Sequence, residues 1–195
     1  GVIKPGEQVT NAGAKPGDVL ILTKPIGTGI ITTAGKAKMA PQSVIDGAVN
    51  AMAELNAKAA EAMLEVGVHS CTDITGFGLI GHLNGMTNGS NVAARLRLSD
   101  VPVFDGVWDL LTKETAPGGT HRNLKSAQRF VRWDPSISQD AKLLMCDAQT
   151  SGGLLLSVAP SKLEVMMDAL STRGVTGTHI GEILESNDPY IEVVA

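Results

Sequence analysis

The sequence predicts an α/β (α+β) domain in which a mixed β-sheet is flanked by helices. Gly contributes 22 of 195 residues and aromatic residues only 3%, so Ala, Val, Leu, Ile and Met must form the core between glycine turns. This composition favours a mixed α/β architecture over an all-β sandwich. Short apolar strands alternate irregularly with helical patterns, which favours a mixed sheet over a strictly doubly wound one.

The composition is that of one globular domain. A hydrophobic content of 43% and a charged content of 18% indicate a sizeable core rather than disorder. The net charge of -4, without a cluster of five or more basic residues, disfavours nucleic-acid binding. The apolar runs are too short to span a membrane and no signal-peptide pattern opens the chain, so we expect a cytoplasmic domain. Cys71 and Cys146 provide neither a disulfide framework nor zinc-site spacing.

Residues 1–17 are rich in Gly and Pro and are expected to be a linker leading into a domain that spans residues 18–195. The first strand is predicted over residues 18–23, where four consecutive apolar residues indicate burial on both faces. Residues 24–29 then turn, and residues 30–39 are left open between a short helix and a loop.

The alanine-rich segment 42–66 is predicted as one helix. Its inward stripe is expected to include Ile45, Val49, Met52 and Leu55, and Gly67 follows as a helix-ending glycine. The remaining elements follow in order: strand 68–72, helix 76–86, strand 91–98 with Arg95 and Arg97 on its solvated face, helix 104–113, loop 117–120, helix 135–146, strand 154–158, helix 160–173, and strands 178–184 and 190–194. The state of residues 124–133 is left open.

The most informative stretch is residues 69–82, in which Asp73 is flanked by Thr72 and Thr75 and followed by Gly76 and Gly78. Asp73 is expected at a tight turn between a short strand and a helix. Glycines permit close backbone approach to a ligand, helix-start amides attract anions, and a carboxylate suits Mg²⁺. The plainer alternative is that Asp73 caps the next helix and that the glycines serve only the turn. From these residues alone, the plainer alternative is favoured.

Four runs together carry a family resemblance. Residues 71–82 read Cys-Thr-Asp-Ile-Thr-Gly-Phe-Gly-Leu-Ile-Gly-His, and residues 22–29 read Leu-Thr-Lys-Pro-Ile-Gly-Thr-Gly. Residues 117–123 read Pro-Gly-Gly-Thr-His-Arg-Asn, and residues 147–155 read Asp-Ala-Gln-Thr-Ser-Gly-Gly-Leu-Leu. In this order they resemble signatures of the C-terminal domain of selenophosphate synthetase (selenide, water dikinase). Ala148 departs from the proline usual there.

The resemblance implies αβα layers like those of the C-terminal domain of aminoimidazole ribonucleotide synthetase. It implies an enzyme that makes selenophosphate, AMP and phosphate from selenide, ATP and water with Mg²⁺. Asp73 would be a Mg²⁺ ligand at an ATP site shared with the protein's own, missing N-terminal domain. Thr72, Thr75, Gly76 and Gly78 are candidates for contacting the nucleotide.

The same resemblance places no catalytic residue in this chain, because the family's cysteine or selenocysteine nucleophile belongs to the N-terminal domain. We therefore expect this chain to be inactive alone. The full-length enzyme would be a homodimer, and neither nucleic acid nor a membrane is expected as a partner.

Several side chains have a structural alternative. His69 and His82 are expected to be structural rather than zinc ligands, because no fourth ligand has suitable spacing. Cys71 is expected to be a small buried hydrophobe. The Lys24 side chain is expected to face the solvent or to form an ion pair.

Two further segments are assigned structural roles. Residues 117–123 are assigned to a surface loop, in which Thr120, Arg122 and Asn123 could otherwise touch an anion. Residues 149–151 are assigned to a turn that bonds its own backbone.

Two other functions remain open. One is a sister ATP-dependent enzyme of the aminoimidazole ribonucleotide synthetase superfamily, against which the residues around Asp73 argue. The other is a binding or interaction domain without catalysis.

Overall fold

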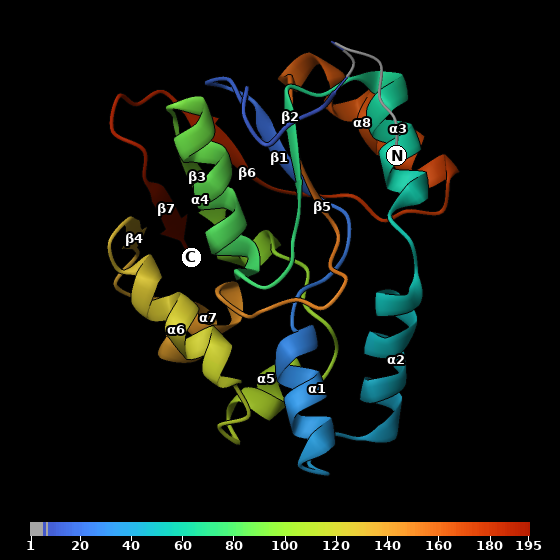
Figure 1. The fold of residues 1–195 in the computed structure, drawn as a ribbon, viewed down its shortest axis with the longest axis vertical. Helices are drawn as coiled ribbons and strands as arrows, with labels where there is room; N and C mark the ends of the chain where they lie inside the picture. The colour runs from blue at the N-terminus through green and yellow to red at the C-terminus, as the bar shows by residue number, and fades with distance from the viewer. Residues whose placement is uncertain (1–5, 7) are drawn as a thin grey trace.

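The computed structural model describes residue 6 and residues 8–195. Its centre is a seven-stranded mixed sheet with the strand order β2-β5-β1-β6-β3-β7-β4 (Figure 1). The strands are β1 (Val19–Leu22), β2 (Ser70–Asp73), β3 (Ala93–Arg97), β4 (Val131–Trp133), β5 (Leu154–Val158), β6 (Thr178–Leu184) and β7 (Ile191–Val194). Pairing is antiparallel from β2 to β3 and parallel from β3 to β4, which confirms the predicted mixed sheet.

Eight α-helices of the described residues surround the sheet. They are α1 (Thr28–Lys36), α2 (Gln42–Ala53), α3 (Ala57–Val66), α4 (Gly78–Ser90), α5 (Val107–Leu111), α6 (Gly118–Ala127), α7 (Gln139–Met145) and α8 (Leu163–Thr172). Short 3-10 turns, η1 (Leu98–Asp100) and η2 (Pro160–Lys162), precede the 101–106 segment and α8. None of the helices in residues 6 and 8–195 is long and apolar enough to cross a membrane.

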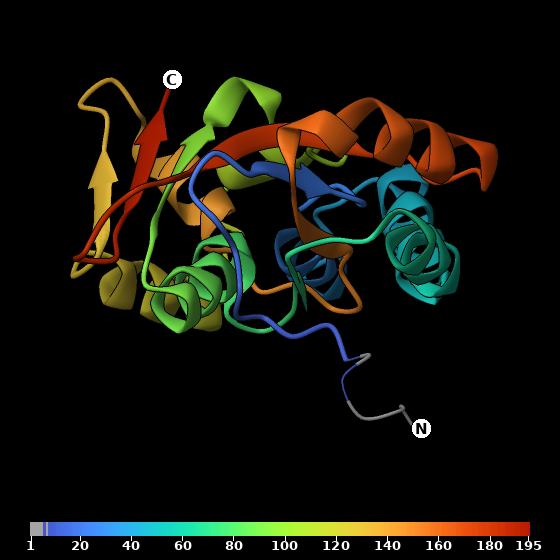
Figure 2. The ribbon, with the colours of Figure 1, turned by 90° about the horizontal axis from the view of Figure 1, so that it is seen from above.

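The sheet separates two apolar cores. Leu20 and Leu22 of β1 face the larger core with α1, α4, α5, α6 and α7, whereas Val19 and Ile21 face a smaller core with α3 and α8. This alternation follows from the two-residue period of a strand. Figure 2 shows α4 and α6 beneath one part of the sheet and α3 and α8 together at its other end. The predicted burial of this strand on both faces is confirmed.

Over β6, β3 and β7, the face of the sheet opposite the larger core carries charged side chains. Arg95 on β3 donates to Glu192 on β7 at 2.7 Å and to Glu182 on β6 at 3.3 Å. The strand register places these three residues directly opposite one another. The predicted solvated face of residues 91–98 is therefore confirmed, and Arg95 is engaged in ion pairs within the sheet.

The prediction of one helix over residues 42–66 is wrong, because α2 ends at Ala53 and α3 begins at Ala57. The Lys24 ammonium donates to the carbonyl oxygens of Ala51 and Glu54 at 2.8 and 2.7 Å. These contacts satisfy carbonyls that the end of α2 leaves without helical partners. Leu55, expected to point inward, is consequently 79% exposed in the break, and Val49 is 48% exposed.

The prediction of a loop at residues 117–120 is also wrong, since α6 begins at Gly118 with Pro117 as its cap residue. Residues 124–133, left open above, complete α6 and form β4. Residues 30–39, also left open, contain most of α1. Helix α4 runs from Gly78 to Ser90 rather than from 76 to 86.

Helices α5 and α7 are shorter than predicted, and the strands 154–158, 178–184 and 190–194 are confirmed within one residue. The predicted linker 1–17 lies partly outside the described residues. Within its described part, the Cys71 amide donates to the Thr10 carbonyl at 2.9 Å, so this segment runs beside β2.

Candidate functional site

Asp73 is the last residue of β2, which is the edge strand of the sheet, and it pairs with Leu154 of β5. Its side chain is exposed, and none of the described residues donates a hydrogen bond to its carboxylate. The tight turn expected at Asp73 follows it over residues 74–77 and leads into α4. A carboxylate without a protein donor is free to bind a cation from outside the domain.

The turn after Asp73 is held from behind by the 149–153 segment. The Ile74 amide donates to the Gly153 carbonyl at 2.9 Å, and the Gln149 amide donates to the Thr75 carbonyl at 3.0 Å. A Cβ at Gly152 would lie 2.2 Å from the Ile74 carbonyl oxygen, so only glycine permits this approach. Two runs that are distant in the sequence therefore form one structural unit.

His82 fixes the inner side of the same turn. Its Nε2 accepts from the Thr75 amide at 3.0 Å and also lies 3.0 Å from the Thr75 hydroxyl. Burial lowers the pKa of His82, an effect opposed by the negative charge of Asp73. An acceptor Nε2 requires the neutral ring, so His82 is structural, as predicted.

The four candidate nucleotide contacts differ in how free they are. The Thr75 hydroxyl is engaged by His82, and Gly78 has φ +72° with its Cα against the backbone of Cys146. The Thr72 hydroxyl donates to the Asp73 carbonyl at 3.2 Å, and a Cβ at Gly76 would meet nothing within 4 Å. Thr72 lines a cleft and Gly76 is unobstructed, so both can be approached by a ligand, whereas Thr75 and Gly78 shape the turn.

Asp147 is the important site residue that the sequence prediction missed. Its buried carboxylate accepts hydrogen bonds from the Gly29 and Ile30 amides at 3.0 and 3.2 Å, and from the Thr120 hydroxyl at 2.7 Å. It thereby caps α1, whose own cap residue Gly27 has no side chain to do so. Burial raises the pKa of Asp147 to about 6, although these donors favour the ionised form.

Gln149 completes this buried polar cluster. Its Oε1 accepts from the amides of Gly27 and Thr28 at 3.0 and 3.1 Å and from the Thr28 hydroxyl at 3.0 Å, while its Nε2 donates to the Asp147 carbonyl at 2.7 Å. The prediction that residues 149–151 bond their own backbone holds for Gln149 only through its Nε2, because its Oε1 reaches the start of α1 instead. All four family-like runs meet here, at the end of the sheet that carries Asp73.

The Lys24 assignment to solvent or an ion pair is wrong. Besides the two carbonyls at the end of α2, its ammonium donates to the Ser151 carbonyl at 3.2 Å. Burial lowers the pKa of Lys24, and the charge of Glu54 opposes this shift. Lys24 therefore joins the α2–α3 break to the 147–153 run.

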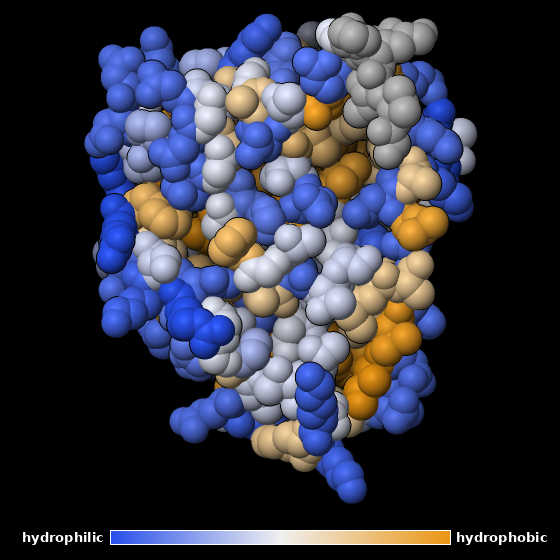
Figure 3. All heavy atoms as spheres, viewed as in Figure 1, coloured by the Kyte–Doolittle hydropathy of each residue, from blue (hydrophilic) through white to orange (hydrophobic). Residues whose placement is uncertain are grey.

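A cleft of about 530 Å³ opens beside Thr72, between α4 and α6. Phe77, Ile80 and Phe130 give it apolar walls, and Arg122 and Asn123 add polar groups. Figure 3 shows apolar side chains exposed within a hollow between the two helices. Such mixed lining is typical of ligand or partner sites.

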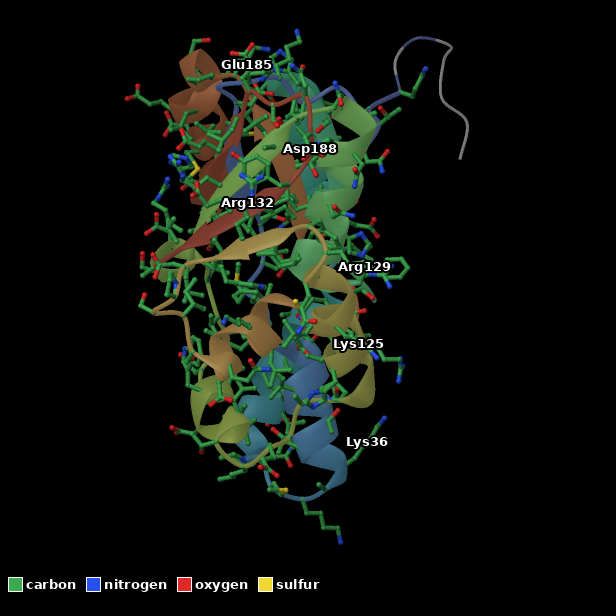
Figure 4. All side chains as sticks on the ribbon, turned by 90° about the vertical axis from the view of Figure 1, so that its left-hand side faces the viewer. Lys36, Lys125, Arg129, Arg132, Glu185 and Asp188 are labelled. Carbon is green, nitrogen blue, oxygen red and sulfur yellow. The ribbon has the colours of Figure 1, made fainter. Side chains whose placement is uncertain are left out.

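Positive charge flanks this cleft in a chain of net charge -4. Residues 115–133 contain Arg122, Lys125, Arg129 and Arg132 but no carboxylate. Figure 4 shows Lys125 of α6 and Arg129 of the turn after it projecting away from the sheet. The local field therefore favours an anionic ligand near α6.

The described residues contain no group of three or more His, Cys, Asp or Glu side chains placed to hold a metal ion. His69 instead pairs with buried Asp18 at 2.8 Å, which confirms its structural role. Cys71 is half-buried beside the smaller core, and Cys146 is fully buried. Burial raises the pKa of both thiols to about 12, so neither is an activated nucleophile.

The seven-stranded mixed sheet with its flanking helices defines a C-terminal domain of the AIR synthase type. The chain belongs to the family described as "AIR synthase related protein, C-terminal domain", which it matches over residues 15–194. Within that family it is similar to the selenide, water dikinase of Geobacter metallireducens, with 42% identity over 194 residues. That match covers 99% of this chain and 56% of the relative, so the chain spans about half the length of the curated relatives it matches.

Solved structures share the fold. The hydrogenase maturation protein HypE of E. coli superposes with a TM-score of 0.70 at 14% identity, covering 98% of this chain and 51% of that one. HypE in complex with ATP superposes with a TM-score of 0.67 at 16% identity, covering 95% and 50%. At these identities the likeness establishes the architecture alone, and it confirms the predicted likeness to aminoimidazole ribonucleotide synthetase-type domains.

Proposed function

We propose that this chain is the C-terminal half of a selenide, water dikinase, which makes selenophosphate, AMP and phosphate from selenide, ATP and water. Its contribution is the Asp73 carboxylate, offered as one Mg²⁺ ligand to an ATP site completed by the N-terminal domain. The observation that carries the proposal is the position of Asp73 at the sheet edge, where it is exposed, receives no hydrogen bond from residues 6 and 8–195, and is braced on both sides by the family-like runs.

The single carboxylate fits this partial role. Mg²⁺ in phosphate-transfer sites is usually held by one or two carboxylates, waters and substrate phosphates. Bound there, the ion would neutralise the clustered negative charge of the triphosphate. Thr72 and Gly76 lie open beside Asp73 to approach the phosphates, and the cations of α6 favour an anion nearby.

Other parts of the proposal rest on the family. The catalytic cysteine or selenocysteine belongs to the N-terminal domain, so the 195-residue chain is inactive alone. The high thiol pKa values of Cys71 and Cys146 support this assignment. The complete enzyme is a cytoplasmic homodimer in this proposal.

The test is AMP formation from ATP and selenide with Mg²⁺ under anaerobic conditions. The full-length protein should form AMP, and the 195-residue chain should not. In full-length Asp73→Asn the rate of AMP formation should fall by more than the tenfold to hundredfold that is typical when an outer-shell partner of a metal is removed. Asp168→Asn, an exposed carboxylate on α8, is the matched control and should retain activity. Selenide-dependent AMP from the chain alone, or full activity in Asp73→Asn, would overturn the proposal.

A further inference from the structure

Helix α6 is joined to the turn after Asp73 by the side chain of Asn123. The Asn123 amide nitrogen donates to the Gly76 carbonyl at 2.9 Å and to the Cys146 carbonyl at 3.1 Å. A side-chain amide has two N–H groups, so both donors are used. Asn123 therefore ties the turn to the backbone that leads into Asp147.

The rest of the turn is held from its other side. Ile74 and Thr75 bond the backbone of the 149–153 segment, and Thr75 also bonds His82. Gly76 has no such packing, because a Cβ there would meet nothing within 4 Å. In the part of the chain that the structure describes, Asn123 is thus the brace on the open side of the turn.

The direction of the Asp73 carboxylate depends on this backbone. No described side chain or amide donates to that carboxylate, so its aim is set by the strand before it and the turn after it. Glycine at position 76 gives the turn wide conformational freedom unless a contact restricts it.

We propose that Asn123 is a positioning residue that fixes the 73–78 turn and so aims Asp73 at the cation. The inference rests on the proposed function and deepens it. In this role Asn123 acts through its bonds to the Gly76 and Cys146 carbonyls rather than as a ligand of the cation. Its loss should weaken Mg²⁺ binding while leaving the chemistry available when Mg²⁺ is raised.

The first experiment measures the Mg²⁺ concentration for half-maximal AMP formation in the full-length enzyme. Asn123→Ala removes both donors, and Asn123→Asp keeps the shape but sets an oxygen against two carbonyl oxygens. Both should raise the Mg²⁺ requirement about tenfold to a hundredfold, with kcat approaching that of the wild type at saturating Mg²⁺. Gln128→Ala removes an exposed amide at the end of the same helix and should leave the requirement unchanged.

The second experiment needs no activity. Amide hydrogen exchange of the 195-residue chain should be about tenfold faster at residues 74–78 in Asn123→Ala and unchanged in β5 and α8. The positioning role would be overturned if the Asn123 variants needed Mg²⁺ within twofold of the wild type, or if their kcat fell and added Mg²⁺ did not restore it. In either case Asp73→Asn would still abolish activity, so the proposed function would stand. Full activity in Asp73→Asn would instead overturn the proposed function and this inference together.

Discussion

The Thr120 hydroxyl donates a 2.7 Å hydrogen bond to the Asp147 carboxylate, and both side chains are fully buried. Thr120→Val should therefore destabilise the domain by about 1.5–3 kcal/mol, since it removes a hydrogen bond to a charged group and leaves that group less satisfied. Urea unfolding at pH 7 measures the change. Thr112→Val, at an exposed position, should stay within about 0.5 kcal/mol of the wild type. Equal effects of the two substitutions would contradict the importance of the buried pair.

Asp147 should make the stability depend on pH. Its folded pKa of about 6 lies above the ordinary value of 3.8, so the folded state binds this proton more tightly than the unfolded state. The resulting stability is fully present below about pH 4 and is lost as the pH rises through about 6, for a total of about 3 kcal/mol.

The difference in unfolding free energy between wild type and Asp147→Asn isolates this effect, because the other groups titrate in both proteins. As the pH rises from 4 to 7, the unfolding free energy of the wild type should fall relative to that of Asp147→Asn. A constant difference over this range would show that Asp147 ionises at its ordinary pKa.

Two helical glycines should respond oppositely to alanine. A Cβ at Gly29 would lie 2.4 Å from the Ala148 carbonyl oxygen and 2.6 Å from Asp147 Oδ1, so Gly29→Ala should cost about 2 kcal/mol or more. Gly47 in α2 has nothing within 4 Å, so Gly47→Ala should stabilise by about 0.5–1 kcal/mol through helix propensity. Thermal unfolding of both variants checks the sign. If both substitutions destabilised the domain, backbone packing at Gly29 would not be the cause of the stability lost in Gly29→Ala.

Lys24→Met should free the junction between α2 and α3. The substitution keeps the apolar stem but removes the donors to Ala51, Glu54 and Ser151, which should cost about 2–3 kcal/mol. Hydrogen exchange should increase at residues 53–57 first. Lys58→Met, an exposed change on α3, is the control, and a similar cost there would rule out the junction as the reason.

Neither cysteine should react readily near neutral pH. With thiol pKa values of about 12, Cys71 and Cys146 should be alkylated by iodoacetamide much more slowly than free cysteine at pH 7.5. Mass spectrometry over time measures this. Rapid labelling of Cys71 in the folded chain would show that its thiolate is accessible and would reopen it as a nucleophile.

Local pattern was sufficient to predict every strand except β4, and the mixed sheet. The apolar run at 19–22 and the alternation around Arg95 follow directly from strand geometry, and the structure places both as expected. Where the prediction failed, a distant contact overrides local preference. The alanine-rich run 42–66 has helix propensity throughout, and its break coincides with Lys24, which lies 27 and 30 residues away from its partners Ala51 and Glu54.

The candidate site was predictable only at its exposed end. Asp73 was singled out because residues 71–82 resemble a family signature, whereas the residues around it alone favoured a helix cap. Asp147 was not identified, and Thr120 was weighed only as a surface-loop residue that could touch an anion, because their roles depend on contacts with residues 27–118 positions away. No periodicity encodes such contacts, although the Asp-Ala-Gln-Thr-Ser-Gly-Gly run indicated that this segment mattered.

The strand order also constrains how this chain reaches its native state. Strand β1 is the first strand in the chain and the third in the sheet, and it pairs with β5 and β6, which follow it by more than 130 residues. Val19 of β1 can pair with its neighbours on the two sides only after Val158 and Glu182 have left the ribosome. Such long-range pairing slows folding and leaves apolar β1 exposed during synthesis. A nascent chain stopped before β5 would therefore hold an unpaired Val-Leu-Ile-Leu strand, a natural target for chaperones.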